Sequence, residues 1–329
     1  MRSALSLCGG YPALEMDPPR HSAWRAIFNR AITPRAIEAI EPFIRRDIDR
    51  HIDEVIEQGR CDFVAAIAEP VPAETICRLV GLEDEHVAPV RQAAIEMFAA
   101  QGDPEEFGRR QAVFAQLTVT QVHARRAHPR DDYLTQVANL TIEGRPVDDN
   151  DMVGLMAAFL GAGHHSTTSA MTSLVNEVFT RPSVRAALAR DRSLIVVAVE
   201  EALRLRPPFF GFYRRTTCPV SVAGTDIPAG SDVYMGWAAA NRDPKVFERP
   251  DEFRIDRSNH NRHLTFGFGI HTCPGAALAR LELRVLLELL LDRMPDLRIE
   301  VTQPSYQFGG GDYNYIPALP VSFTPAARR

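Results

Sequence analysis

Residues 266–282, which read FGFGIHTCPGAALARLE, decide the fold of this chain. Cys273 stands directly before Pro274, a residue that suits the first turn of a helix, and the apolar residues that follow predict a helix over residues 275–294. The sulfur is therefore expected at a helix N-terminus. There the free N–H groups and the helix dipole favour a thiolate.

Three roles are open to Cys273 in this glycine-rich loop. It could be a buried structural cysteine, as most lone cysteines are. It could be a nucleophile, a role that needs a base such as His271 in place. Finally, a thiolate among N–H donors, with Gly267, Gly269 and Gly275 admitting a flat ligand, suits the axial ligand of haem iron.

The composition is that of an ordinary globular protein. Apolar residues make up 45% and charged residues 24% of the 329-residue, 36.6 kDa chain, which is enough for one large or two ordinary domains. The 37 basic and 42 acidic residues nearly balance. A global positive field of the kind that holds nucleic acid is therefore not expected.

Cysteine usage and hydropathy favour a cytoplasmic protein without a membrane span. The five cysteines are odd in number and form no CxxC pair, so neither a disulfide framework nor a zinc site is expected. Residues 1–10 are too short and too polar for a secretory signal. Residues 152–176 carry no charge and are long enough to span a bilayer, but their centre reads HHSTTS. This polar block favours a buried helix instead.

Most of the chain shows helical periodicity. Isoleucines at intervals of three and four follow Thr33, which predicts a helix over residues 33–58 with Thr33 as its cap. Ser193 is expected to cap a helix that ends before the proline pair at 207–208. Further helices are expected around residues 62–80, 86–100, 105–126 and 150–176.

The pattern changes near residue 218. The runs VSVAG, TDIPAG and SDVYMGW place β-prone residues between Gly and Pro turns, which predicts a small antiparallel hairpin region at residues 218–238. The tail at 305–323 has strand-like pieces as well. We therefore expect a mainly α protein with a minor antiparallel β part.

Several segments resemble the cytochrome P450 family. The spacing Phe266-x-x-Gly269-x-His271-x-Cys273-x-Gly275 is similar to the family's haem-binding signature, and Glu201-Ala202-Leu203-Arg204 resembles its ExxR motif. Weaker similarities follow in the family's order: DPPRHSAWR at 17–25, AGHHSTT at 162–168, ANRDP at 240–244, HLTFGFG at 263–269 and ALPVSF at 318–323. The resemblance implies a P450-like helical prism with small antiparallel β-sheets, formed by residues 1–329 as one domain and holding haem b.

The resemblance also implies which residues hold the cofactor. Cys273 would be the ligand of the iron, and His21, Arg25, Arg214 and His271 match positions that bind the haem propionates, two carboxylates that need cationic donors. The other expected contacts come from the cysteine loop and the distal helix: Phe266, Gly267, Gly275 and Ala162.

The ExxR pair Glu201 and Arg204 would have a structural role. Taken alone, the pair is an ordinary i, i+3 contact on a helix surface. In the family it is buried and locks the segment beneath the haem loop, together with an arginine from the turn region. Glu252 stands where that arginine would be, so Arg254 or Arg257 is expected to replace it.

The distal helix departs from the family pattern. The segment A-G-x-acid-Thr, which relays protons for oxygen activation, aligns with His165 at the acid position and Ser166 at the threonine position, followed by Thr167. These three are the expected catalytic residues, because a hydroxyl and an imidazole can still carry protons. Simple packing of the polar block is the poorer alternative, since buried polar side chains need partners.

An apolar substrate pocket is expected next to this helix. Phe209, Phe210 and Phe212 follow the ExxR helix, where a strand of the family lines the pocket, and Ala158 and Ala162 would add wall from the distal helix. The same residues could equally belong to the core.

In known bacterial members, several tens of residues precede the DPPxH motif, which here begins at Asp17. The resemblance therefore implies that the usual N-terminal segment is lacking, through an incomplete gene product or start-site choice, or because the member is naturally short.

The expected function is that of a soluble haem-thiolate monooxygenase. It would use O2 on a small apolar organic substrate, with electrons from a ferredoxin-type donor and its NAD(P)H-dependent reductase, and without a nucleic-acid or membrane partner. One alternative is a haem-thiolate protein without ordinary oxygenase activity: peroxide-dependent, catalysing rearrangement or coupling, or a truncated haem binder. The other is a cysteine hydrolase, which only Cys273 and His271 favour.

Overall fold

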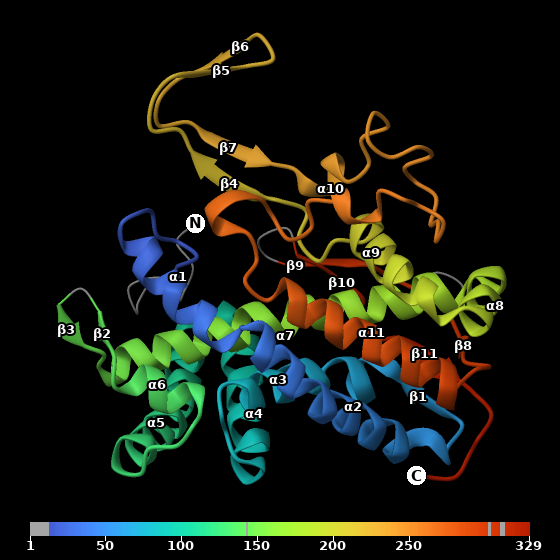
Figure 1. Cartoon of the computed structure of the whole chain (residues 1–329), viewed down its shortest axis with the longest axis horizontal. Coiled ribbons are helices and arrows are strands. Elements are labelled where there is room, and N and C mark those ends of the chain that lie inside the picture. Colours follow the sequence, from blue (N-terminus) through green and yellow to red (C-terminus); the bar gives the residue numbers. More distant parts are fainter. Residues whose placement is uncertain (1–12, 143, 302–303, 310–312) are drawn as a thin grey trace.

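Helices make up most of the molecule, and the short strands form several small sheets and hairpins around the helices (Figure 1). The computed structural model describes residues 13–142, 144–301, 304–309 and 313–329, so Cys8 lies outside the described residues. The mainly α class with small antiparallel sheets is confirmed. The helices are α1 (Arg20–Ala31), α2 (Pro34–Ile56), α3 (Pro70–Leu79), α4 (Asp84–Ala99), α5 (Pro104–Ala127), α6 (Tyr133–Ala138), α7 (Asp149–Phe179), α8 (Pro182–Arg190), α9 (Ile195–Leu205), α10 (Trp237–Ala240) and α11 (Ala276–Arg293).

All described strand pairs are antiparallel. One sheet has three strands in the order β1 (Arg60–Asp62), β11 (Pro320–Ser322) and β8 (Arg298–Ile299). The other pairs are β2 (Thr141–Ile142) with β3 (Arg145–Pro146), β4 (Phe212–Arg215) with β7 (Asp232–Met235), β5 (Val220–Val222) with β6 (Thr225–Ile227), and β9 (Gln307–Gly309) with β10 (Tyr313–Tyr315). The β5–β6 hairpin projects farthest from the helices, in line with its exposed residues (Figure 1).

Helix α7 is the central element of the fold. It packs against α3, α5, α9 and α11, and begins at a capping box formed by Asp148 and Asp151. Gly163 lets α3 approach closely, because a Cβ at this position would lie 2.7 Å from Cδ1 of Ile76. The polar block of α7 finds partners: the Ser169 hydroxyl, for example, donates to the Asn314 carbonyl at 2.5 Å.

Helix α2 confirms the isoleucine pattern. The Thr33 hydroxyl accepts a hydrogen bond from the Ala36 N–H at 3.2 Å, as expected of the cap. The isoleucines at 44, 48, 52 and 56 are almost completely buried, and the helix packs against α11 and α3.

The region predicted as one helix over 62–80 is divided. It contains the end of β1, a π-helical turn at Val64–Ala68 and then α3. Pro70 and Pro72 have no N–H, so the α-helical hydrogen bonds to the carbonyls of Ala66 and Ala68 cannot form.

One predicted helix cap was wrong, and the start of another helix is shifted by one residue. The carboxylate of Asp191, not Ser193, caps the 3₁₀ turn Arg192–Leu194 by accepting the Ser193 N–H at 2.9 Å, and α9 begins only at Ile195. Helix α11 begins at Ala276 with Gly275 at the cap position, so Pro274 lies outside it.

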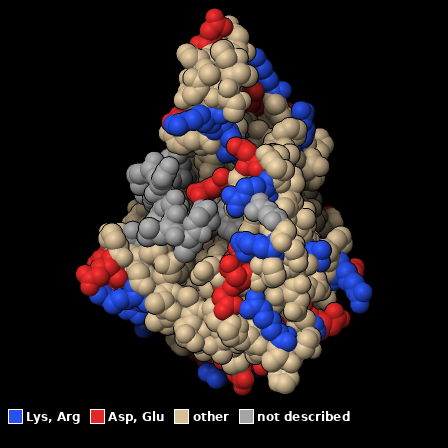
Figure 2. Space-filling view, turned by 90° about the vertical axis from the view of Figure 1, so that its left-hand side faces the viewer, with Lys and Arg blue, Asp and Glu red and all other residues tan. Residues whose placement is uncertain are grey.

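The surface carries both charge signs. On the face seen in Figure 2, basic and acidic side chains are interspersed, as the near-balance of charges leads one to expect. Within the described ranges, no helix is both long enough and apolar enough to cross a membrane.

Candidate active site

The cysteine loop is a tight turn between two glycines and α11. Gly267 and Gly269 have φ values of 71° and 79°, a left-handed conformation that favours glycine. The Cys273 N–H donates to the Phe266 carbonyl at 2.8 Å, which closes the loop. Gly275 follows at the cap of α11. Phe266, Gly267, Cys273 and Gly275 therefore stand on one closed turn.

Burial dominates the electrostatics of Cys273. It raises the pKa of the thiol, while the Gly275 N–H and the charges of Arg25 and Arg280 act in the opposite direction. The N–H group at the start of α11 thus acts in the expected direction, but burial outweighs it. A bound cation is what would hold this sulfur as a thiolate.

Four expected propionate ligands come together beside the loop. His21 and Arg25 lie one turn apart on α1, and the rings of His21 and His271 are 4.4 Å apart. Arg25 donates to the Thr272 carbonyl at 2.6 Å. Burial, and then the charges of His21, Arg214 and Arg25, lower the pKa of His271, which places Arg214 of β4 near the same group.

This cluster fits an anionic partner. The His21 Nε2 is buried and has no hydrogen-bond partner among the described residues. Buried nitrogen atoms normally find an acceptor. An orphaned nitrogen amid two arginines and a second histidine suits the carboxylates of a haem.

The ExxR pair is completely buried. Arg204 donates from Nε and Nη2 to the two oxygens of Glu201 at 2.7 and 2.8 Å, and both side chains are 0% exposed. Arg204 also donates to the carbonyls of Asn241, Pro250 and Glu252. The pair therefore fixes the turn region, which rules out the surface interpretation of this pair.

Arg257 is the third member of the ExxR cluster. Its Nε donates to the Glu201 carboxylate at 2.8 Å, and its side chain is buried. Arg254 contributes only its backbone N–H, because its side chain turns outward to Asp256. The structure thus decides between the two arginines that the sequence left open.

The distal segment lies at the middle of α7. The Ser166 hydroxyl donates to the Ala162 carbonyl at 2.6 Å, and Ala162 is exposed although most of the helix around it is buried. Thr167 points into the core and is 5% exposed. The structure therefore separates the two hydroxyls that the sequence placed side by side.

Both histidines of this segment are neutral near pH 7. Burial lowers the pKa of His165, and burial with the neighbouring ring lowers that of His164 to about 3. His164 Nε2 lies 3.0 Å from the Glu69 carbonyl, which anchors α7 to the start of α3. The Tyr313 hydroxyl donates to the His165 carbonyl at 2.5 Å.

The three phenylalanines do not form one group. Phe209 lies 5.2 Å from Phe212 and 5.5 Å from Tyr313 between ring centroids, next to the distal helix. Phe210 lines a separate hollow of about 540 Å³ with residues such as Arg206. Ala158 is buried, whereas Ala162, one turn later on α7, is exposed.

The sequence did not reveal every residue around the loop. Buried Glu200 and His263 and partly exposed Arg280 form a cluster beside Phe266, although none of them had been assigned a role. Of the three, His263 belongs to a segment that resembles the family, whereas Glu200 directly precedes the ExxR motif and Arg280 follows the haem-binding signature.

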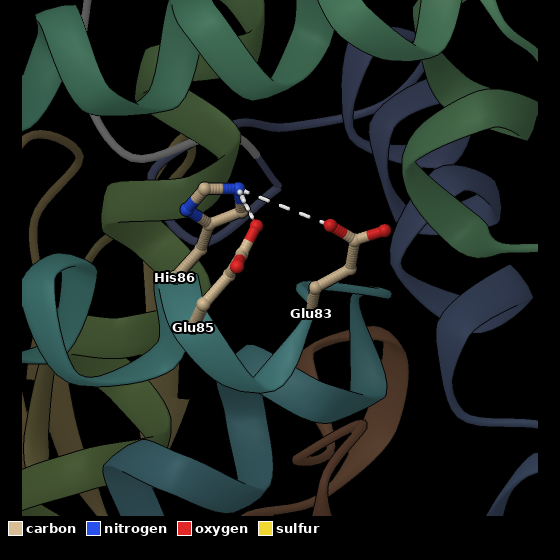
Figure 3. A group of neighbouring side chains, drawn as sticks. All are labelled: Glu83, Glu85 and His86. Atoms are coloured by element: carbon tan, nitrogen blue, oxygen red, sulfur yellow. Dashed lines mark ion pairs between the residues drawn. The ribbon is translucent and has the colours of Figure 1, made fainter.

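A surface group near the start of α4 is separate from this site. Glu83, Glu85 and His86 bring their ligand atoms within 4.8 Å of one another (Figure 3). Glu83 is already paired with Arg130. Exposed carboxylates often cluster in this way without a metal, so we assign none to this group.

Comparisons with known proteins agree with the geometry. The family model described as Cytochrome P450 matches residues 101–295. Cyclomarin C epoxidase CymV of Salinispora arenicola is 35% identical over 87% of this chain and 74% of its own length. The Steroid C26-monooxygenase of Mycolicibacterium smegmatis is 32% identical over 95% of this chain and 80% of its own.

Solved structures extend the comparison to the fold. The crystal structure of HmtN, a post-tailoring hydroxylase involved in himastatin biosynthesis, covers 98% of this chain and 85% of its own. It has a TM-score of 0.86 at 31% identity. Since a family model, sequence relatives and solved structures agree, the chain belongs to the cytochrome P450 family and is a haem b-dependent monooxygenase.

Proposed function

We propose that the protein inserts one oxygen atom from O2 into a C–H or C=C bond of a small apolar organic substrate. The convergence of His21, Arg25, Arg214 and His271 beside Cys273 is the observation that carries this proposal. Relatives named as an epoxidase and as hydroxylases support both bond types. Within the described part of the chain the cysteines are unpaired, which supports the reducing cytoplasm as the location.

The cofactor would be held from two sides. Cys273 would bind the iron, and the two arginines and two histidines beside it would bind the propionates. When bound, haem supplies the electron transfer and oxygen activation that side chains cannot provide. Electrons would come from a ferredoxin-type donor with an NAD(P)H-dependent reductase.

Ser166 and His165 of α7 would relay protons to the site of oxygen activation. The Ser166 hydrogen is engaged by the Ala162 carbonyl, so its oxygen lone pairs are available to accept a proton donor. His165, neutral at pH 7, can pass a proton between its two ring nitrogens. Phe209, Phe212 and Tyr313 would form the apolar wall that positions the substrate and excludes water.

A second function is favoured by the same segment. His165 and Ser166 stand where the family has an acid and a threonine, so the protein would instead use peroxide or catalyse rearrangement or coupling. Turnover with NADPH and added redox partners, compared with turnover with peroxide, separates the two functions.

The ligand assignment is tested with the CO complex of the reduced protein. The wild-type protein should show the red-shifted band that gives the family its name, and Cys273→Ser should lose it while retaining some haem through the propionate contacts. An unchanged CO spectrum in Cys273→Ser would refute the assignment.

The proton role is tested by the yield of product per NADPH consumed. Ser166→Ala should divert reducing equivalents to peroxide without changing substrate-induced spectral shifts. Thr168→Ala is the matched control, because its hydroxyl donates to the His164 carbonyl in the same i, i−4 manner. If Ser166→Ala and Thr167→Ala both keep the wild-type yield of product per NADPH, the result favours the peroxide or rearrangement function.

A further inference from the structure

An ionic cluster lies behind the cysteine loop and is distinct from the ExxR cluster; its Glu200 and His263 are buried, and its Arg280 is partly exposed. Glu200, on α9, is 4% exposed and receives a two-point contact from Arg280 of α11: Nε to Oε1 at 2.6 Å and Nη2 to Oε2 at 2.9 Å. His263 Nε2 lies 3.0 Å from the same Oε2. Three segments that are distant in sequence thus meet at one carboxylate.

The hydrogen bonds show how Glu200 is held. His263 Nδ1 lies 3.3 Å from the Thr265 N–H, which can only donate, so Nδ1 accepts and Nε2 carries the hydrogen given to Glu200. Despite its burial, hydrogen bonds from His263 and Arg280 lower the pKa of Glu200 to about 2, so Glu200 is ionised at any working pH. The Glu200–Arg280 pair is therefore electrically neutral as a unit.

Phe266 contacts both this pair, through its ring, and Cys273, through its backbone carbonyl. The Arg280 guanidinium lies over the Phe266 ring, 4.5 Å from its centroid, and the His263 ring is 5.9 Å away. The Phe266 carbonyl accepts the Cys273 N–H. Arg280 is also near enough for its charge to act on the Cys273 thiol. Its positive charge therefore sits close to the sulfur and is compensated by Glu200.

We propose that Glu200 is a positioning and charge-compensating residue for Cys273: it holds Arg280 on Phe266 and cancels most of the Arg280 charge felt at the sulfur. The proposal rests on Cys273 being the ligand of the haem iron. Charges and hydrogen bonds around the axial ligand are known to set haem potentials. Glu200 would thereby keep the iron potential lower than the uncompensated arginine would allow.

The two single variants have opposite expected signs. Glu200→Gln leaves the Arg280 charge uncompensated, which favours the reduced, more negative iron and should raise the reduction potential. Arg280→Gln leaves a buried carboxylate, which should lower the potential when measured at mildly alkaline pH, where Glu200 stays ionised. The double variant has neither charge and should return towards the wild-type value. A purely structural role would not reverse sign between the two single variants.

The experiment is a spectroelectrochemical titration of the haem-loaded proteins, with haem content and CO spectrum recorded alongside. Arg284→Gln is the matched control, because Arg284 lies one turn later on α11, is similarly exposed and pairs instead with Glu41 and Glu288. It should leave the potential unchanged. A red-shifted CO band in the wild-type protein establishes the cysteine ligand independently of this test.

Shifts of the same sign in both single variants, or no shift beyond that of Arg284→Gln, would overturn the proposal. So would a double variant no closer to the wild-type protein than the single ones. If Glu200→Gln does not retain haem, the test rests on the other two variants. The proposal then requires that Arg280→Gln lowers the reduction potential and that the double variant restores it towards the wild-type value.

Discussion

Replacing Glu282 by glutamine should remove a loss of stability that the wild-type protein undergoes as the pH rises. Glu282 lies on α11, is 2% exposed and has one oxygen without a hydrogen-bond partner among the described residues. The polar neighbour of Glu282 is the Thr75 hydroxyl, which also lacks a hydrogen-bond partner of good geometry. Thr75 therefore stabilises a charge on Glu282 only weakly. Burial raises the pKa of Glu282 to about 8. The side chain is thus a neutral acid at pH 7.

The sign and size follow from proton linkage. Between pH 4.5, the ordinary pKa of the carboxyl group, and about 8, the folded state keeps a proton that the unfolded state has lost. The free energy of unfolding therefore falls with rising pH by about 1.4 kcal/mol per pH unit. Over 8 − 4.5 = 3.5 units this amounts to about 5 kcal/mol, of which about 3.4 kcal/mol is lost by pH 7. Above pH 8 the loss is complete and the curve levels off.

The measurement is urea unfolding of the haem-loaded protein, followed by its helical circular dichroism at several pH values between about 5 and about 8. The difference between Glu282→Gln and the wild-type protein should grow in favour of the variant by about 1.4 kcal/mol per pH unit. Glu288→Gln is the control, because Glu288 lies on the same helix but is paired with Arg45 and Arg284 at the surface. Parallel curves for Glu282→Gln and the wild-type protein would refute the reasoning.

Three further substitutions test other parts of the structure. Arg257→Ala should cost about 3–5 kcal/mol by stranding a buried charge, with loss of haem, whereas Arg254→Ala should stay within about 0.5 kcal/mol in thermal unfolding; equal effects would contradict the assignment of Arg257. Gly163→Ala should cost about 1–3 kcal/mol because its Cβ meets Ile76, and adding Ile76→Val should recover part of this loss; no recovery would locate the strain elsewhere. His165→Asp should move the acid limb of the yield of product per NADPH to lower pH, because a carboxylate titrates below an imidazole; an unmoved limb would remove His165 from the proton path.

The fold was predictable where residue type and spacing act locally. The isoleucine spacing of α2 and the cap at Thr33 were read correctly, since both depend on neighbours within a few residues. Ser193 was misjudged because Asp191, two residues earlier, is a charged acceptor that takes both the N–H and the hydroxyl of Ser193 as donors. The π-helical turn before α3 was missed because two missing proline N–H groups act on carbonyls four residues away, within a continuous apolar pattern.

The site was predictable only as a set of positions. Glu201 and Arg204 share a helix, so their pairing followed from spacing, but the choice of Arg257 over Arg254 depends on how a turn folds back on α9. The separation of Phe210 from Phe209 has the same origin, because it depends on which way an irregular segment turns.

The neighbouring carboxylates of α9 have a consequence for how the molecule opens. Glu201 holds the turn region through Arg204 and Arg257, and Glu200 holds the cysteine loop and α11 through His263 and Arg280. Neither segment can detach without leaving a buried charge unpaired. Amide hydrogen exchange in residues 241–257 and 263–282 is therefore expected to proceed as one cooperative unit, at a rate set by the displacement of α9 rather than by separate fluctuations of the loops.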